Sequence, residues 1–195
     1  MINDPIARFG ELLERARQSD LAEPTAMALA TADGEGRPTV RMVLLKGFDR
    51  DGFVFFTNLE SRKAADLAEN PRAALCFHWQ LLELQVRVEG KVSPVSEEEA
   101  DAYFASRPRG SQIGAWASRQ SRPLAAREDL EARILETEAR YAGLAVPRPS
   151  FWSGYRVAPD RIEFWSGRPS RLHDREVYHA DPAMDGGWRV ERLYP

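Results

Sequence analysis

Four cationic side chains lie close together in the sequence, on segments where charges are unusual. Arg41 and Lys46 belong to a run with strand character, and Arg62 and Lys63 follow Ser61, which can begin a helix. An unpaired buried charge is costly, so cations inside a strand need an anionic partner. A helix N-terminus also favours an anion. This first basic cluster predicts a site for a small anion, most simply a phosphate, although Arg62 and Lys63 taken alone also fit solvated charges.

A second group of anion-binding side chains lies further along the chain. Tyr103 and Arg107 are four residues apart, which places a hydroxyl and a guanidinium side by side near a helix end. Ser111 follows Pro108 and adds a further donor. Arginine can hold a phosphate through two parallel hydrogen bonds. These three side chains fit a phosphate clamp, and they fit an ordinary helix end equally well.

A third cluster combines Trp165 with Arg171, His173 and Arg175. If residues 171–175 are extended, the last three side chains line one face of a strand. Three such groups repel one another unless an anion or an electron-rich ring faces them. His173 then stands where it can polarise a substrate. The alternative is an exposed edge strand whose charges prevent aggregation.

The chain has 195 residues, a net charge of −3 and a pI of about 5.7. Its length, with 43% hydrophobic residues, is sufficient for one domain, residues 1–195, with a proper core. Basic clusters that are separate in an acidic chain argue against binding to nucleic acid. No apolar run reaches the length of a membrane span and no secretion signal is evident, so we expect a cytoplasmic protein without membrane contact.

The single cysteine, Cys76, excludes an internal disulfide framework and a cysteine-based metal site. Its apolar neighbours at residues 73–77 favour a small core residue. We therefore expect no metal.

Apolar residues recur with helical spacing in some segments and alternate in others. This pattern predicts helices at residues 4–19, 61–69, 96–106, 111–118 and 123–142. It predicts strands at residues 25–31, 38–46, 53–57, 73–79, 83–92, 151–157, 161–166, 171–179 and 187–193. Ser61 and Ser96 are expected N-caps, and Pro123 suits a first helical turn.

The short connections between strands favour antiparallel pairing, and neither a GxGxxG motif nor a P-loop occurs. The expected fold is mainly β with peripheral helices (α+β), a closed or nearly closed antiparallel barrel. It carries a helical insertion at residues 96–142 and C-terminal strands at residues 151–195.

Eight motifs, taken in order, resemble the pyridoxine/pyridoxamine 5′-phosphate oxidase family. They are RMVLLK (41–46), FT (56–57), SRK (61–63), SRPR (106–109), SQIGAW (111–116), QS (120–121), IEFW (162–165) and RLHDR (171–175). The likeness runs from about Asp4 to the C-terminal residue. Each motif alone is weak, but their common order is specific.

The resemblance implies an FMN-binding split β-barrel that forms a homodimer, with each flavin held between subunits. Residues implied to contact FMN are Arg41, Met42, Val43, Leu44, Leu45, Lys46, Phe56, Thr57, Arg62, Lys63, Gln85, Gln120, Ser121, Trp165 and Arg175. Residues implied to contact the substrate are Lys46, Tyr103, Arg107, Ser111, Arg171 and His173. Arg171 and His173 are implied to be catalytic, orienting the substrate over the flavin and stabilising developing charge.

The implied reaction is oxidation of pyridoxamine or pyridoxine 5′-phosphate to pyridoxal 5′-phosphate, with O₂ as acceptor, hydrogen peroxide as a product and ammonia released from the amine. One alternative is a split-barrel flavin oxidase of another pathway, such as a phenazine-biosynthesis relative. The clamp of Tyr103, Arg107 and Ser111, together with Arg171-Leu-His173, argues against it. Another is a non-catalytic protein that binds FMN or pyridoxal phosphate.

Three positions depart from the family pattern. Family members commonly carry a basic N-terminal extension that helps cover the substrate, whereas this sequence begins near its first helix. Glu83 and Leu84 precede Gln85, where a basic residue is common, so we expect altered packing or interface contacts with flavin binding retained. Phe56 stands where a tyrosine is common and lacks its hydroxyl.

Overall fold

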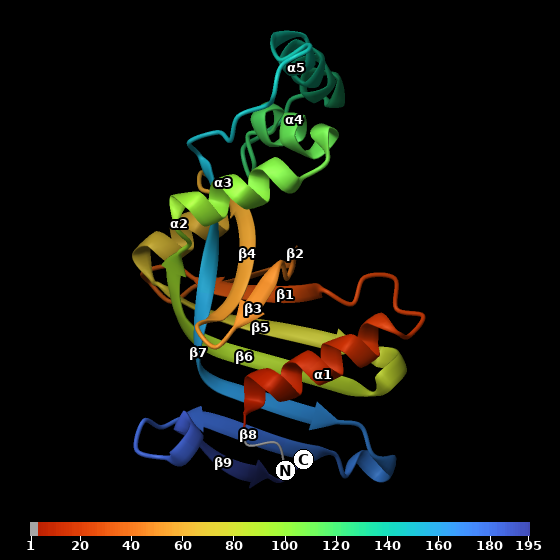
Figure 1. Cartoon of the computed structure of the whole chain (residues 1–195), viewed down its shortest axis with the longest axis vertical. Coiled ribbons are helices and arrows are strands. Elements are labelled where there is room, and N and C mark those ends of the chain that lie inside the picture. The colour runs from red at the N-terminus through yellow and green to blue at the C-terminus, as the bar shows by residue number, and fades with distance from the viewer. Residues whose placement is uncertain (1–3) are drawn as a thin grey trace.

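One antiparallel sheet organises the protein in the computed structural model, which describes residues 4–195 (Figure 1). Its strands are β1 (Ala26–Ala32), β2 (Pro38–Leu44), β3 (Gly47–Asp49), β4 (Gly52–Asn58), β5 (Arg72–Trp79), β6 (Leu84–Pro94), β7 (Trp152–Ser166), β8 (Asp174–Ala180) and β9 (Trp188–Leu193). The strand order is β2-β1-β5-β6-β7-β4-β3, and β8 and β9 extend the sheet from β7. The expected mainly β, antiparallel fold is confirmed.

The longest strand, β7, makes the sheet curl. Its first part pairs with β4 and its second part with β8, while β6 follows both parts. The register of β6 shifts between Glu89 and Gly90, opposite Pro159. A Cβ at Gly90 would lie 1.9 Å from the Ala158 carbonyl oxygen, so only glycine permits this close approach. The prediction of two strands, 151–157 and 161–166, is therefore wrong, because the irregularity bends one strand without ending it.

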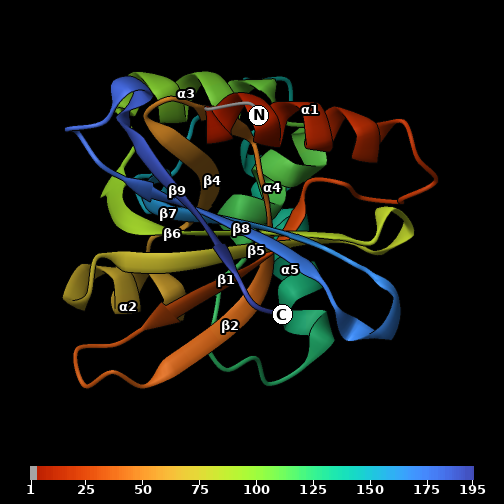
Figure 2. The same ribbon diagram turned by 90° about the horizontal axis from the view of Figure 1, so that it is seen from below.

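Helix α1 (Pro5–Arg17) closes the core of the sheet. Asp4 caps it, its carboxylate accepting hydrogen bonds from the backbone N–H groups of Ile6 and Ala7. Phe9 is fully buried and meets Phe53 and Phe77 with ring centroids 4.9 Å apart. Burial of such a ring contributes about 1.5–3 kcal/mol. In the view from below, α1 lies along the side of the curled sheet away from β2 (Figure 2).

The remaining α-helices are α2 (Arg62–Glu69), α3 (Glu97–Ser106), α4 (Arg109–Ala117) and α5 (Arg127–Arg140). Helices α3, α4 and α5 lie at the opposite end of the molecule from β8 and β9 (Figure 1). Ser96 caps α3 as predicted, since its hydroxyl accepts a hydrogen bond from the Glu99 N–H. Pro123 does not begin α5, which starts four residues later. No helix within residues 4–195 is both long and apolar enough to cross a membrane.

The last part of the sheet also differs from the prediction. Residues 171–173 are not extended, because Pro169–Arg171 forms a single 3-10 turn and β8 begins only at Asp174. Ser170 and Arg171 have φ values of 58° and 62°, in the left-handed region that non-glycine residues seldom occupy. The expectation that Arg171, His173 and Arg175 line one strand face is therefore wrong.

Candidate functional site

A cavity of about 590 Å³ opens between β2, β4 and the helices α3 and α4. It collects many of the predicted site residues, namely Arg41, Met42, Val43, Leu44, Lys46, Phe56, Thr57, Lys63, Tyr103, Arg107, Ser111 and Gln120. A second hollow of about 470 Å³ shares Arg41 and Lys63 with it and adds Arg62 and Ser121. The first basic cluster and the clamp of Tyr103, Arg107 and Ser111 therefore line two adjoining cavities that share wall residues. Leu45 does not line it, since its side chain is buried in the core.

Lys63 is held in this region by neutral oxygens. Its ammonium donates hydrogen bonds to Thr57 Oγ1 at 3.0 Å, Ser61 Oγ at 3.2 Å and Gln120 Oε1 at 2.6 Å. Burial, with a smaller effect from the charge of Arg41, lowers the pKa of Lys63 to about 8. Within residues 4–195 no carboxylate forms an ion pair with this ammonium. Its charge is therefore available to an incoming anion.

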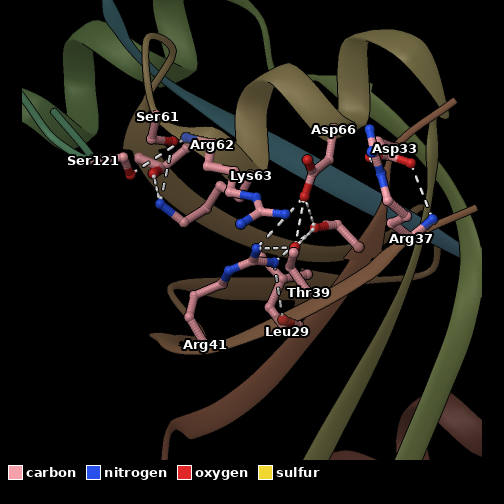
Figure 3. A network of polar contacts seen from close by, with 12 residues as sticks. Leu29, Asp33, Arg37, Thr39, Arg41, Ser61, Arg62, Lys63, Asp66 and Ser121 are labelled. Atoms are coloured by element: carbon pink, nitrogen blue, oxygen red, sulfur yellow. Dashed lines mark hydrogen bonds and ion pairs between the residues drawn. The ribbon is translucent and has the colours of Figure 1, made fainter. Parts of the chain in front are cut away.

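Ser61 occupies the N-cap position of α2, as predicted, but its hydroxyl does not cap the helix. It accepts a hydrogen bond from Lys63 instead, and the Ser61 carbonyl oxygen accepts hydrogen bonds from the N–H groups of Ala64 and Ala65. The N–H of Arg62 donates to Ser121 Oγ at 3.3 Å, which brings the chain after α4 to this helix end. Arg62, Lys63 and Ser121 lie together in Figure 3.

Arg41 is restrained by a carboxylate that the sequence analysis did not single out. Its guanidinium donates to Leu29 O at 3.1 Å and Thr31 Oγ1 at 2.7 Å, and lies 3.6 Å from Asp66 Oδ2 (Figure 3). Burial alone raises the pKa of Asp66, but hydrogen bonds from Thr31 and Thr39, together with nearby arginines, outweigh it and the pKa lies below its usual value. Asp66 lies on the buried face of α2, and a charged residue at such a position in the sequence could have indicated a buried ion pair.

The second basic group rests on aromatic rings. Tyr103 stacks on Phe56 with centroids 4.1 Å apart and an interplanar angle of 17°. The guanidinium of Arg107 lies 4.8 Å from the centroid of the Trp152 ring, and its Nη1 is buried without a hydrogen-bond partner. Burial lowers the pKa of Arg107. Arg107 lines the first cavity, and a guanidinium with an unpaired donor there fits a ligand that supplies an acceptor.

The remaining predicted residues lie elsewhere. Gln85 of β6 pairs with Trp165 of β7, which pairs with Arg175 of β8. His173 and Arg175 line a separate cavity of about 390 Å³ at the β8–β9 end. The rings of Trp165 and His173 are 4.5 Å apart. None of these four residues, nor Arg171, lines the first cavity in the described chain.

Leu84, which precedes Gln85, packs against the main core. It therefore faces away from Gln85 as expected, because neighbouring residues of a strand point to opposite sides.

Glu163 is a further residue that the sequence analysis did not assign. Its side chain is 1% exposed and accepts hydrogen bonds from Arg87, Arg161 and Arg175. Burial raises its pKa, but these three arginines outweigh that effect and lower the pKa to about 2. A glutamate inside the central strand motif IEFW, among apolar neighbours, was the signal for a buried ion pair.

The curled antiparallel sheet, with cationic side chains around one cavity, has the architecture of the flavin-binding split β-barrel fold. The same fold occurs in a pyridoxamine 5′-phosphate oxidase-related, FMN-binding protein from Nostoc punctiforme, with a TM-score of 0.78, 18% identity and coverage of 97% of this chain and 96% of that one. PhzG from Burkholderia lata, solved with tetrahydrophenazine-1-carboxylic acid, superposes with a TM-score of 0.92 at 34% identity over 98% of this chain and 93% of that one.

Sequence comparisons specify the family. Residues 13–141 match the pyridoxamine 5′-phosphate oxidase model, and residues 152–195 match the pyridoxine 5′-phosphate oxidase C-terminal dimerisation region. Pyridoxine/pyridoxamine 5′-phosphate oxidase of Myxococcus xanthus is 62% identical over 98% of this chain and 92% of its own. The Zymomonas mobilis enzyme is 56% identical over the full length of both chains. The chain belongs to the pyridoxine/pyridoxamine 5′-phosphate oxidase family and is an oxidase of vitamin B6 metabolism.

Proposed function

We propose that the protein oxidises pyridoxamine 5′-phosphate and pyridoxine 5′-phosphate to pyridoxal 5′-phosphate, using FMN as cofactor and O₂ as electron acceptor. Hydrogen peroxide is the second product, and ammonia leaves from the amine substrate. The observation that carries this proposal is the pair of cationic sites on one cavity, around Lys63 and around Arg107. Two phosphorylated ligands that must lie in contact, a cofactor and a substrate, require two such sites.

The residues around Lys63 fit the phosphate of FMN. Within residues 4–195 the Lys63 ammonium has no carboxylate partner, Arg62 adds a second cation, and both residues lie at the N-terminus of α2, where the helix dipole favours an anion. The charge of Arg41 is partly neutralised by Asp66, so Arg41 attracts the phosphate less strongly than Lys63 does and lies at the edge of the site. When bound, FMN supplies the redox chemistry by accepting a hydride equivalent and passing the electrons to O₂.

The residues around Arg107 fit the phosphate of the substrate. Arg107 supplies a buried Nη1 donor that has no hydrogen-bond partner among residues 4–195, and Tyr103 and Ser111 line the same cavity. Lys46 enters the cavity from the segment after β2 and is the cation shared by the two ligands. This arrangement binds and orients the substrate, which is the main contribution expected where no strong general base is present.

We infer that a second copy of the chain completes the site. Trp165, Arg171, His173 and Arg175 do not line the first cavity of their own chain, and all four lie in the segment that matches a dimerisation region. In a homodimer with the flavin between subunits, these residues reach the cavity of the other copy together with Gln85. Arg171 and His173 then orient the reacting carbon, and a homodimer is part of the proposal.

Product analysis tests the proposed function. Purified, FMN-loaded protein is incubated in air with pyridoxamine 5′-phosphate, and pyridoxal 5′-phosphate, hydrogen peroxide and ammonia are each quantified. The proposal predicts equal amounts of the three products. A protein that retains FMN and binds the substrate but forms no pyridoxal 5′-phosphate is instead the non-catalytic binding protein.

A further inference from the structure

Arg107 is oriented by a ring rather than by a carboxylate. No carboxylate within residues 4–195 forms an ion pair with it, and its Nη1 is buried without a hydrogen-bond partner. The guanidinium carbon instead lies 4.8 Å from the Trp152 ring centroid and 5.6 Å from that of Phe104. A guanidinium at these distances is attracted by the negative face of the ring. The ring fixes its position and leaves its donors and its charge unused.

Trp152 is itself held firmly. Its side chain is 6% exposed, and its ring meets Phe104 edge-on, with centroids 5.1 Å apart and an interplanar angle of 70°. Its backbone N–H donates to Pro149 O at 3.0 Å, and its carbonyl accepts a hydrogen bond from Arg148 at 2.7 Å. A ring restrained at both backbone and side chain can define where a flexible guanidinium lies.

The same ring belongs to a layer that includes the other aromatic residues of the cavity wall. Phe56 is nearly parallel to Trp152, at 6° and 5.4 Å, and Tyr103 is at 12° and 6.1 Å. Trp152 therefore contacts both members of the pair Tyr103 and Arg107. A carboxylate at this position would hold Arg107 as well, but it would neutralise the charge that a phosphate needs.

We propose that Trp152 is a positioning residue of the substrate-phosphate site. It holds Arg107 by a cation–π contact, so that the guanidinium is ordered before the phosphate arrives and keeps its donors free for it. This inference rests on the proposed function, because it takes the ligand of Arg107 to be the substrate phosphate. It adds a residue that acts through Arg107 and makes no contact with the phosphate itself.

The test uses the FMN-loaded protein and 4-deoxypyridoxine 5′-phosphate, an unreactive probe that keeps the phosphate and lacks the group to be oxidised. Binding is measured by calorimetry for the wild type, Trp152→Leu and Trp152→Phe. Loss of one cation–π contact predicts a roughly 3- to 30-fold weaker affinity for Trp152→Leu. Trp152→Phe retains a ring face and is expected to recover most of that loss, whereas FMN affinity stays unchanged in both variants.

A double-mutant cycle separates positioning from general packing. In an Arg107→Met background, Trp152→Leu should have no further effect on probe binding, because the residue through which it acts is gone. Trp116→Leu is the matched control. Trp116 lies in α4, one of the helices beside the cavity, and its indole N–H donates to Pro147 O at 2.8 Å. Its side chain does not line the cavity. This control should bind the probe as the wild type does.

Three results overturn the inference. They are wild-type probe affinity in Trp152→Leu, an equal loss for FMN and the probe, and an undiminished effect of Trp152→Leu in the Arg107→Met background. If Trp152→Leu does not fold, the same double-mutant cycle is measured with Trp152→Phe, for which a smaller loss of probe affinity is expected. If the losses of probe affinity caused by Trp152→Phe and Arg107→Met simply add in the double variant, the inference is overturned. A wild-type protein that does not bind the probe contradicts the proposed function as well, which distinguishes the two failures.

Discussion

Glu163 and Arg175 form a two-point ion pair on neighbouring strands. Arg175 Nε donates to Glu163 Oε1 at 2.8 Å, and Arg175 Nη2 donates to Glu163 Oε2 at 3.2 Å. The Glu163 side chain is 1% exposed, and its carboxylate also forms ion pairs with Arg87 and Arg161. A fork of this kind fixes the plane of the guanidinium. Arg175 is thus ordered within its own subunit before it meets the flavin that we propose lies in the dimer interface.

Replacing Glu163 with Gln should destabilise the fold. The three arginines would lose their common carboxylate, and breaking a buried ion pair of this kind costs about 3–5 kcal/mol of unfolding free energy. Denaturation by urea at pH 7 measures the effect. Glu191→Gln is the control, because Glu191 is a partly exposed strand carboxylate paired with His179, and little change is expected. Equal effects of the two substitutions would contradict a special role for Glu163.

The same pair predicts a pH dependence. The pKa of Glu163 in the folded protein is about 2 and its usual value is 4.5, so folding favours the ionised form. Its stabilisation is fully present above about pH 4.5 and is lost as the pH falls toward 2. The stability difference between the wild type and Glu163→Gln should therefore shrink between pH 6 and about pH 3. A constant difference across this range would show that the lowered pKa does not contribute.

FMN affinity of the apo protein should fall above pH 8 because of Lys63. Its pKa is about 8 before an anion binds, and only the charged form attracts phosphate. The phosphate itself keeps its charge at this pH, so affinity declines by at most about tenfold per pH unit. Titration of FMN fluorescence between about pH 7 and about pH 9 measures the decline. Lys63→Arg does not titrate in this range and should give a flat profile. A flat wild-type profile would contradict the assignment.

Arg107→Ala should weaken substrate binding and spare FMN. Removing one charge-assisted hydrogen bond to phosphate costs about 1.5–3 kcal/mol, or roughly 10- to 100-fold in affinity. The FMN content should stay near that of the wild type, because the cations around Lys63 are a separate group. Calorimetry with an unreactive substrate analogue and FMN release on denaturation give the two values. If the variant loses FMN but binds the substrate analogue with normal affinity, the assignment of Arg107 to the substrate phosphate is wrong.

Arg171→Leu should slow flavin reduction at saturating substrate, rather than only raise KM. The milder variant His173→Asn keeps a polar group, and reoxidation by O₂ should change little in either variant. Stopped-flow spectroscopy separates the two half-reactions. Arg168→Leu is the control, because Arg168 directly precedes the turn Pro169–Arg171 and its exposed side chain pairs with Asp174. Wild-type reduction rates in Arg171→Leu and His173→Asn would make both residues structural.

The sequence was informative where function depends on local residue type. The cations Arg41, Lys46, Arg62 and Lys63 stand out on a predicted strand and at a helix start, and all four line the two connected hollows. The positions of β1, β5 and β6 followed from alternation, because every second residue along much of these strands is buried. These are local properties, and a single sequence displays them directly.

What could not be predicted depends on contacts between distant segments. The left-handed turn at Ser170 and Arg171 is held by a hydrogen bond from Leu172 N–H to Pro169 O. No residue pattern in the sequence predicted this turn. Glu163 gains its role only because β6, β7 and β8 bring three arginines to it. The separation of His173 and Arg175 from the first cavity depends on tertiary structure in the same way.

Anaerobic mixing of the FMN-loaded protein with pyridoxamine 5′-phosphate tests the central claim most directly. Without O₂, the account predicts that the yellow flavin absorbance bleaches in a single turnover, that one pyridoxal 5′-phosphate forms per flavin, and that admitting O₂ restores the colour with release of hydrogen peroxide. A flavin that stays oxidised in the presence of saturating, demonstrably bound substrate would contradict the account.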